Sequence, residues 1–218
     1  MNMAACGDVS EDGIEEPVLF SGLPEPVLAV GRVAFSALQR EERLDPEQLA
    51  LRTGLDADAI DLALRWLHDA GLVERDADDR IVGFAGLTLE PTNHLLVLDG
   101  QCLHAWCAID AVGIPAALSL DAHVTTPCAH CGSSLAVDID HGEPPLDSFL
   151  RGWIPPTDCD NVRAEVCPLA NLFCSQEHLN RWRAVAGNPH GQVADLARFA
   201  ELGRRAWGDL ATKGNEHG

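Results

Sequence analysis

A thiol and a carboxyl stand three residues apart in the stretch His104-Ala105-Trp106-Cys107-Ala108-Ile109-Asp110 of this 218-residue chain. We expect a helix from Cys102 to Ile114, because the residue before Pro115 is pushed away from helical geometry. On a helix, Cys107 and Asp110 share one face. A thiolate is a soft metal ligand and a nucleophile, and a carboxyl can carry a proton. The spacing alone also fits a buried cysteine beside a solvated aspartate.

Upstream of this stretch, helix caps and apolar periodicity predict three helices followed by two short strands. The predicted elements are a helix over Val27–Gln39, a helix capped by Asp45 that runs to Arg52, a helix capped by Asp56 that ends at Gly71, and strands at Leu72–Glu74 and Ile81–Phe84. This order resembles a winged helix-turn-helix, which is either a DNA-binding unit or a helical scaffold. The third helix begins Asp56-Ala57-Asp58-Ala59-Ile60-Asp61, and these carboxylates would repel phosphates. The charge pattern favours a scaffold.

The charge of the whole chain points the same way. Lys and Arg total 15 and Asp and Glu total 34, which gives a formal net charge of −19. Such a surface disfavours nucleic acids and anionic membranes, and no apolar run approaches the roughly 18 residues that cross a bilayer. The segment Met1–Glu16 contains no Lys or Arg, so it does not match a secretory signal. We therefore expect a cytoplasmic protein, in which eight cysteines indicate metal or catalytic thiols rather than disulfides.

Downstream of Asp110 the pattern alternates strands, turns and helices. Strands are expected at His94–Leu98, Ala122–Thr126 and Leu135–Ile139, extended segments at Val162–Val166 and Leu169–Phe173, a Gly/Pro-rich connection at His141–Pro156, and helices from Ser175 to Ala186 and from Gln192 to Leu210. The predicted fold class is α+β, in which the winged-helix-like unit precedes a core of mainly antiparallel strands with flanking helices. We expect an acidic lead-in (1–25), the helical unit (26–86), a catalytic core (87–212) and a tail (213–218).

Two cysteine segments together resemble a known family. The first is Trp106-Cys107-Ala108-x-Asp110, followed by Pro115-Ala116 and then Cys128. The second is Asn161-Val162-Arg163-x-x-Val166-Cys167, followed by Phe173 and Ser175. With Gly86-Leu87-Thr88-Leu89 and the helical unit, these segments resemble organomercurial lyase (alkylmercury lyase) over roughly residues 26 to 210. The joint presence of Cys107, Asp110 and Cys167 in this order carries the resemblance.

The resemblance implies protonolysis of a carbon–mercury bond, which releases a hydrocarbon and Hg(II). Cys107 and Cys167 would bind mercury, with Asp110 beside the metal as the group that moves the proton. Mercury is soft and prefers thiolate ligands, and the leaving carbon needs a proton at short range. The resemblance further implies no organic cofactor, a need for external low-molecular thiols, and possible transfer of Hg(II) to a mercuric reductase. Pro168 replaces a cysteine of the family pattern, and Cys128 matches a cysteine regarded there as structural.

A second set of ligand-type residues departs from that pattern. Cys128-x-x-Cys131 and Cys174-x-x-x-His178 are two short pairs that together fit a structural Cys₃His zinc site, although they can also be unrelated residues. Cys6, Cys102 and Cys159 have no partner at ligand spacing, and we expect them to be bystanders. A metal-responsive winged-helix regulator, or a protein that binds thiophilic metals without cleaving anything, remain the alternatives to a lyase.

Overall fold

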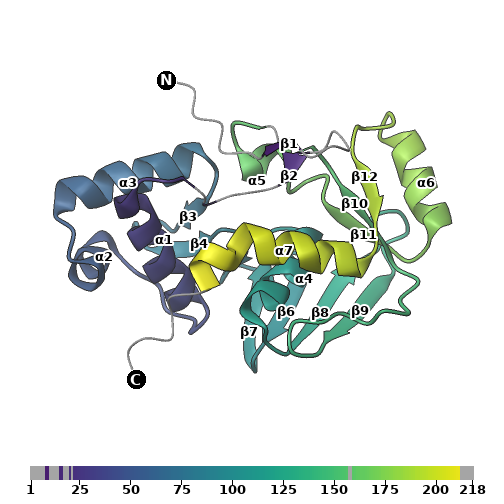
Figure 1. Ribbon diagram of the computed structural model, residues 1–218, viewed down its shortest axis with the longest axis horizontal. Coiled ribbons are helices and arrows are strands. Elements are labelled where there is room, and N and C mark those ends of the chain that lie inside the picture. The colour runs from purple at the N-terminus through teal and green to yellow at the C-terminus, as the bar shows by residue number, and fades with distance from the viewer. Residues whose placement is uncertain (1–7, 10–14, 17–19, 21, 157–158, 212–218) are drawn as a thin grey trace.

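The structure, a computed structural model, describes residues 8–9, 15–16, 20, 22–156 and 159–211 (Figure 1). Most of the predicted lead-in, Cys6 and the predicted tail 213–218 lie outside the described residues. Asp8–Val9 (β1) and Glu15–Glu16 (β2) pair as two short antiparallel strands.

The N-terminal part contains the three predicted helices, and side-chain caps mark where the second and the third begin. They are Glu25–Leu38 (α1), Pro46–Thr53 (α2) and Ala57–Asp69 (α3). Asp45 accepts a hydrogen bond from the backbone N–H of Gln48 at 2.8 Å, while the Gln48 side chain accepts one from the N–H of Asp45 at 3.0 Å. Asp56 caps α3 in the same way through the N–H of Ala59. Sequence and structure agree here to within a few residues.

A seven-stranded antiparallel sheet forms the middle of the molecule, in the order β3-β4-β5-β7-β6-β8-β9. Its strands are Val73–Arg75 (β3), Ile81–Phe84 (β4), Leu87–Thr88 (β5), His94–Leu98 (β6), Gln101–Ala105 (β7), Ala122–Pro127 (β8) and Ser134–Ile139 (β9). Gly83 pairs with Thr88, and Leu87 pairs with Ala105. The hairpin that follows the helices is therefore hydrogen-bonded into the same sheet as the strand that leads to Cys107.

A second sheet of three strands lies beside the first, in the order β11-β10-β12. It comprises Arg151–Ile154 (β10), Asn171–Phe173 (β11) and Gln192–Ala194 (β12), and the nearby helices are Val162–Glu165 (α5) and Gln176–Val185 (α6). Ala108–Leu118 (α4) and Leu196–Ala211 (α7) complete the fold. The α+β class with antiparallel sheets is confirmed.

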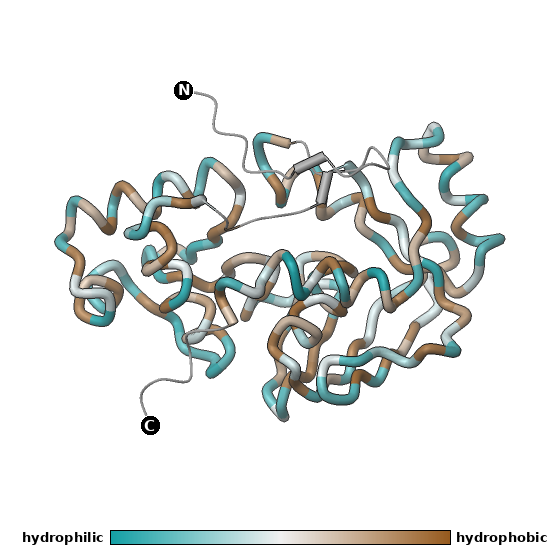
Figure 2. The backbone as a smooth tube through the Cα atoms, in the orientation of Figure 1, coloured by the Kyte–Doolittle hydropathy of each residue, from teal (hydrophilic) through white to brown (hydrophobic). Residues whose placement is uncertain are grey.

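Helices α4 and α7 pack closely against each other. All residues of α4 from Ala108 to Ala116 are buried, whereas α7 alternates apolar and polar residues as an amphipathic helix does (Figure 2). Gly113 of α4 faces Gly203 of α7, and a Cβ atom built on Gly203 would lie 2.2 Å from the Gly113 Cα. Only glycine permits this approach of the two backbones.

Two sequence expectations around the thiols are wrong. The predicted helix from Cys102 is strand β7 as far as Ala105, and α4 begins at Ala108 and continues through Pro115 to Leu118. All residues from Ala105 to Ala116 are buried, and a run buried on every side shows no helical periodicity, so the sequence does not indicate where the strand ends and the helix begins. The segment Val162–Glu165 is a helical turn rather than an extended segment, because the Asn161 side chain accepts a hydrogen bond from the N–H of Ala164 at 2.9 Å.

Two further boundaries differ from the expectation. The first residues of the predicted helix Gln192–Leu210 form β12, and the Asp195 carboxylate accepts a hydrogen bond from the N–H of Arg198 where α7 begins. Strand β10 lies inside the stretch that was expected to be a connection, His141–Pro156. Among the described residues, no helix is long and apolar enough to cross a membrane.

The α4–α7 contact yields a stability prediction. Gly203→Ala should lower the free energy of unfolding by about 2–3 kcal/mol, because the new methyl group overlaps the Gly113 backbone. Gly208→Ala, on the same helix, adds a methyl group that meets nothing within 4 Å and should be neutral or stabilising by up to about 1 kcal/mol. Urea denaturation of both variants measures the difference, and equal stabilities would contradict the assigned contact.

Candidate functional site

The N-terminus of α4 holds the first thiol and the carboxyl group. Cys107 is the N-cap residue, with extended backbone angles (φ −148°, ψ 177°), directly after β7 and Trp106. Asp110 lies in the first turn of α4, and its Oδ2 atom accepts a hydrogen bond from the Cys107 N–H at 2.9 Å. This bond satisfies a backbone N–H that the helix cannot satisfy itself. It also holds the carboxyl next to the cysteine, as expected of a cysteine that starts a helix.

The second thiol approaches from a separate segment. Cys167 lies in a turn between α5 and β11. The Ala108 N–H donates a hydrogen bond to the Ala170 carbonyl at 3.2 Å, so this turn rests on the N-terminus of α4. The ligand atoms of Cys107, Asp110 and Cys167 all lie within 4.8 Å of one another. The fold thus brings together the three residues singled out from the sequence.

Burial controls the protonation of this group. Cys107, Asp110 and Cys167 are only 2%, 7% and 9% exposed. Burial penalises charge, so it raises the pKa of the Cys107 thiol well above its usual value and raises the pKa of Asp110 to about 6. Hydrogen bonds from Cys107 and the charge of Arg163 oppose the rise at Asp110. Near neutral pH the site therefore combines a protonated thiol with a carboxyl that is readily protonated.

A polar pocket of about 300 Å³ leads to the second thiol. Cys167 is among its lining residues, which are Thr92, Asn93, His94, Trp106, Arg163, Cys167, Pro168 and Asn171. Cys107 and Asp110 are not among its lining residues, and both are buried. Of the two thiols, Cys167 is therefore the one that this pocket exposes.

Arg163 joins the pocket to the N-terminal part of the chain. Its guanidinium lies 4.5 Å from the centroid of the Trp106 ring and forms two hydrogen bonds with the Glu74 carboxylate, at 3.0 and 3.2 Å. In the sequence, Arg163 stands out only as part of a motif, and nothing indicates a role for Glu74. This ion pair joins β3 to α5. Because the two residues lie 89 positions apart in the chain, no local sequence pattern predicts the contact.

Gly86 was also missed as a site residue. It lies between β4 and β5 with φ +92°, and a Cβ atom there would lie 2.5 Å from the Asp110 Cγ. Its carbonyl accepts a hydrogen bond from the Trp106 N–H at 2.8 Å. The Asp110 carboxyl therefore packs directly on glycine backbone. Its place in the quoted segment Gly86-Leu87-Thr88-Leu89 was the one available signal.

Known proteins share both this sequence pattern and this fold. The family model described as alkylmercury lyase matches residues 87–208. Alkylmercury lyase of Bacillus cereus is 30% identical over 178 residues, which cover 79% of this chain and 78% of that protein. The chain belongs to the alkylmercury lyase family.

Other relatives agree with this assignment. The alkylmercury lyase of Staphylococcus epidermidis is 29% identical over 178 residues, 79% of each chain. The crystal structure of the mercury-bound form of MerB2 has a TM-score of 0.81 at 23% identity, and it covers 88% of this chain and 94% of its own. As a member of the alkylmercury lyase family, the chain is an organomercurial lyase, which cleaves carbon–mercury bonds in mercury resistance.

The remaining ligand-type residues predicted from the sequence form a second cluster in this alkylmercury lyase. The ligand atoms of Cys128, Cys131, Cys174 and His178 all lie within 4.8 Å of one another. Cys102 is exposed on β7, and Cys159 is half-buried. Neither Cys102 nor Cys159 belongs to a group of three or more metal-ligating side chains in the described part of the chain.

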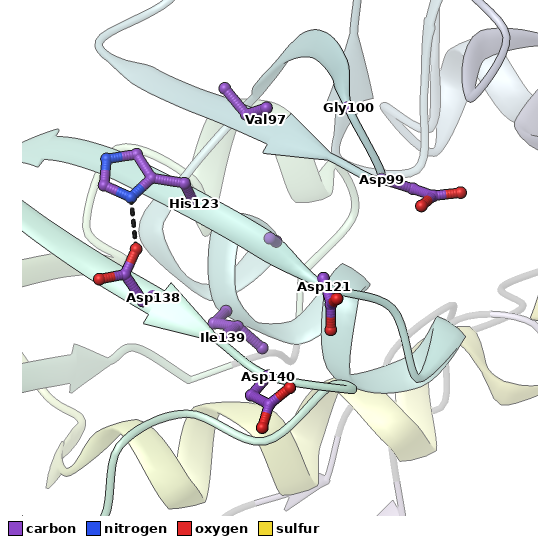
Figure 3. A pocket seen from close by; sticks show the side chains of 9 residues that line it. Val97, Asp99, Gly100, Asp121, His123, Asp138, Ile139 and Asp140 are labelled. Carbon is purple, nitrogen blue, oxygen red and sulfur yellow. Dashed lines mark hydrogen bonds and ion pairs between the residues drawn. The ribbon is translucent and has the colours of Figure 1, made fainter.

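A further hollow, of about 480 Å³, lies at the edge formed by β6, β8 and β9 (Figure 3). Its side chains include four aspartates, and the His123 ring bonds to the Asp138 carboxylate at 2.6 Å. The residues that line it are Val97, Asp99, Gly100, Asp121, Ala122, His123, Asp138, Ile139 and Asp140. Because no thiol lines this hollow, it does not suit a thiophilic metal.

His94 lines the polar pocket next to Cys167, and it makes the folding stability of the lyase depend on pH. Its Nδ1 atom lies 2.8 Å from the Thr126 hydroxyl, and burial lowers its pKa from 6.5 to about 4. The unfolded chain takes up a proton on this histidine below about pH 6.5 and the folded chain does not, so folding stability falls as the pH drops from about 6.5 towards 4.

We predict that His94→Gln removes this part of the pH dependence. Between pH 7 and 4.5, the stability of the wild type should fall by about 2 kcal/mol relative to that of the variant in urea titrations. The opposite contribution of Asp110 is common to both proteins and cancels. His123→Gln, at an exposed histidine of β8, is the matched control and should follow the wild type. A constant difference between wild type and His94→Gln would refute the assignment.

Proposed function

We propose that Cys107, Cys167 and Asp110 carry out the carbon–mercury cleavage of this lyase. Cys107 and Cys167 bind the mercury, and Asp110 transfers the proton. One observation supports this most directly: two sulfur atoms and a carboxylate oxygen, contributed by separate segments, lie within 4.8 Å of one another in the interior. One soft metal ion can contact all three atoms, and both thiols are ligands that mercury prefers.

The reaction begins when R–Hg⁺ enters the polar pocket and meets Cys167. A sulfur–mercury bond forms, and the Cys167 thiol proton leaves to solvent. Cys107 then binds the same ion, and its proton passes to the Asp110 carboxylate beside it. Finally, Asp110 delivers this proton to the carbon as the electron pair of the carbon–mercury bond becomes the new carbon–hydrogen bond. The products are R–H, Hg(II) held by two thiolates, and one proton released to solvent.

The protonation of the buried groups suits these steps. Because the pKa of Cys107 is raised, its thiol keeps the proton until mercury displaces it. Asp110, with a pKa of about 6, accepts and returns a proton near neutral pH more readily than an ordinary aspartate. Burial brings the pKa of this carboxyl closer to the pH at which it works.

We further propose that the N-terminal unit (26–86) is a winged-helix-like scaffold for the catalytic core (87–212) rather than a DNA-binding domain. Strands β3 and β4 are hydrogen-bonded into the large sheet, and Glu74 binds Arg163 at the pocket. Asp58 and Asp61 of α3 are exposed, and a carboxylate surface repels phosphates. These contacts also argue against the metal-responsive regulator.

Release of the product calls for external groups. Two buried thiolates hold Hg(II) strongly, so we infer that low-molecular thiols, or direct transfer to a mercuric reductase, complete the turnover. We also infer a cytoplasmic location, because reduced low-molecular thiols are abundant there. No organic cofactor enters these steps.

The two thiols can be tested by removing each one. Cys107→Ala and Cys167→Ala should each lower the release of methane or benzene from methyl- or phenylmercury by roughly 100-fold or more, measured by gas chromatography with excess thiol. Cys102→Ala, at an exposed cysteine outside the site, is the matched control and should keep full activity. Turnover like that of the wild type in either of the first two variants would overturn the assignment of that thiol.

The carboxyl can be separated from metal binding. Asp110→Asn should still bind about one Hg(II) per chain through Cys107 and Cys167. Its hydrocarbon release should fall by about 10²–10⁴-fold, because an amide cannot accept and return the proton as a carboxylate can. Asp138→Asn, at an exposed carboxyl of β9, is the control. Binding without cleavage in the wild type would instead support the alternative of a thiophilic-metal-binding protein. Full release by Asp110→Asn would place the proton donor elsewhere.

A further inference from the structure

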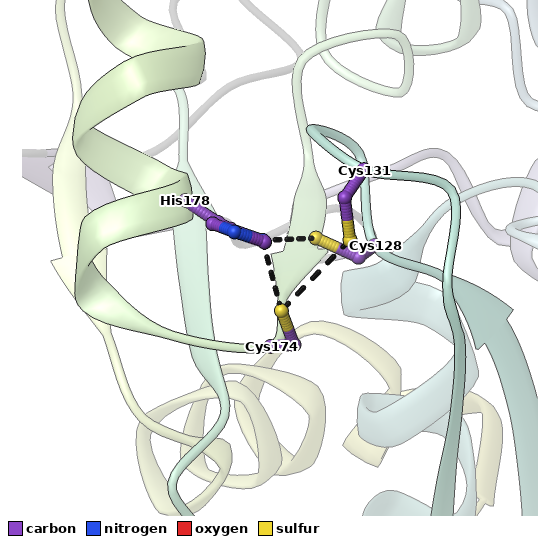
Figure 4. Close-up of side chains that lie close together, drawn as sticks. All are labelled: Cys128, Cys131, Cys174 and His178. Carbon is purple, nitrogen blue, oxygen red and sulfur yellow. Dashed lines mark hydrogen bonds between the residues drawn. The ribbon is translucent and has the colours of Figure 1, made fainter.

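Three thiols and an imidazole converge away from the pocket, at a place where the two sheets meet (Figure 4). Cys128 and Cys131 come from the turn between β8 and β9, and Cys174 and His178 come from the junction of β11 with α6. We call these four residues the Cys₃His cluster. The mercury reaction proposed above uses none of them.

The distances within the cluster suit a small tetrahedral ion. A tetrahedral site with zinc–sulfur bonds of about 2.3 Å places its ligand atoms roughly 3.6–3.8 Å apart. The Cys128 sulfur lies 3.7 Å from His178 Nδ1, and the Cys131 and Cys174 sulfurs are 4.0 Å apart. The contact between Cys174 and His178, at 3.0 Å, needs to lengthen by only about half an ångström.

Neighbouring groups hold the ligands in place. The Cys128 sulfur receives hydrogen bonds from the backbone of His130, Cys131 and Cys174. Gly132, with φ +72°, allows the tight turn after the second thiol. The Ser175 hydroxyl accepts a hydrogen bond from the His178 N–H at 3.2 Å and caps α6, which fixes the start of the helix that carries the imidazole. Such supporting bonds around the ligands are typical of a built metal site.

We propose that the Cys₃His cluster is a structural zinc site. Four protein ligands complete a tetrahedral shell and leave no open position for a substrate, as in structural rather than catalytic zinc sites. Three sulfurs and one nitrogen form a ligand set that zinc prefers among the abundant divalent ions. A carboxylate stands within reach of the Cys107 site, whereas the Cys₃His cluster contains none, so the cluster has no group to protonate a carbon.

The ion would brace the segment that presents Cys167. The Ala129 N–H donates a hydrogen bond to the Leu172 carbonyl at 3.0 Å, so the thiol-bearing turn already contacts β11. Cys174 directly follows β11, and the turn that carries Cys167 lies just before this strand. Zinc would therefore hold the far end of the segment whose near end rests on α4. This gives the ion a positioning role that does not depend on chemistry at the cluster.

The composition of the wild-type protein tests the proposal first. Full-length protein from cells grown without mercury should contain about one zinc per chain and no iron, as measured by inductively coupled plasma mass spectrometry. X-ray absorption at the zinc edge should show about three sulfur neighbours at ~2.3 Å and one nitrogen at ~2.0–2.1 Å. Folded protein with zinc only at background, with iron in its place, or with a shell of oxygen and nitrogen neighbours would overturn the proposal.

Matched variants then locate the ion. Cys131→Ser should lose most of the zinc and melt about 5 °C or more below the wild type, whereas Cys102→Ser should keep both zinc and melting temperature. Cys107→Ala should also keep its zinc, which separates the Cys₃His cluster from the mercury site. Full zinc content in Cys131→Ser would overturn the site, and so would loss of zinc in Cys107→Ala. If Cys131→Ser does not fold, the sulfur count in the wild-type absorption spectrum decides alone.

Discussion

The hydrogen bond from the Cys107 N–H to the Asp110 carboxylate is the contact on which the arrangement of the site depends. It joins the first residue before α4 to the first turn of that helix, so thiol and carboxyl move as one unit. Three further contacts keep this unit in place. Gly86 allows backbone to lie against the carboxyl, Gly203 lets α7 pack onto α4, and the Ala170 carbonyl docks the second thiol segment.

Burial controls the protonation of this unit. Shielding from water raises the pKa of the Cys107 thiol, which stays protonated near neutral pH, and raises the pKa of Asp110 only to about 6, so this carboxyl exchanges its proton readily. Arg163 moderates the effect, because its charge lowers the pKa of Asp110 while Glu74 holds the guanidinium in place. In the proposed mechanism, mercury displaces the two thiol protons, and one of them passes through Asp110 to the carbon.

Sequence patterns located what is encoded locally and missed what arises from packing. Caps at Asp45, Asp56 and Ser175 marked three helices well, because each cap is a bond between near neighbours. The sequence did not indicate the junction between β7 and α4, because the residues around it are buried on all sides and show no helical periodicity. The three thiol and carboxyl residues were found because motif order is visible in a single sequence. Glu74 and His94 act through contacts with segments distant in the chain, and no local pattern signals such contacts.

Because the large sheet is continuous, the part of the chain that the family model matches is not a separate folding unit. The family match begins at Leu87, in the strand that pairs with β4 of the helical unit. In a fragment that begins at Leu87, the backbone groups of β5 that pair with β4 would have no partner. The fragment would also lack Glu74, which binds Arg163, and Gly86, which lies against Asp110. The stretch that the family model matches is therefore shorter than the region that folds, and the relatives themselves align over 79% of the chain. Transferring residues 87–208 to another protein would therefore require the first three helices and their hairpin to be transferred as well.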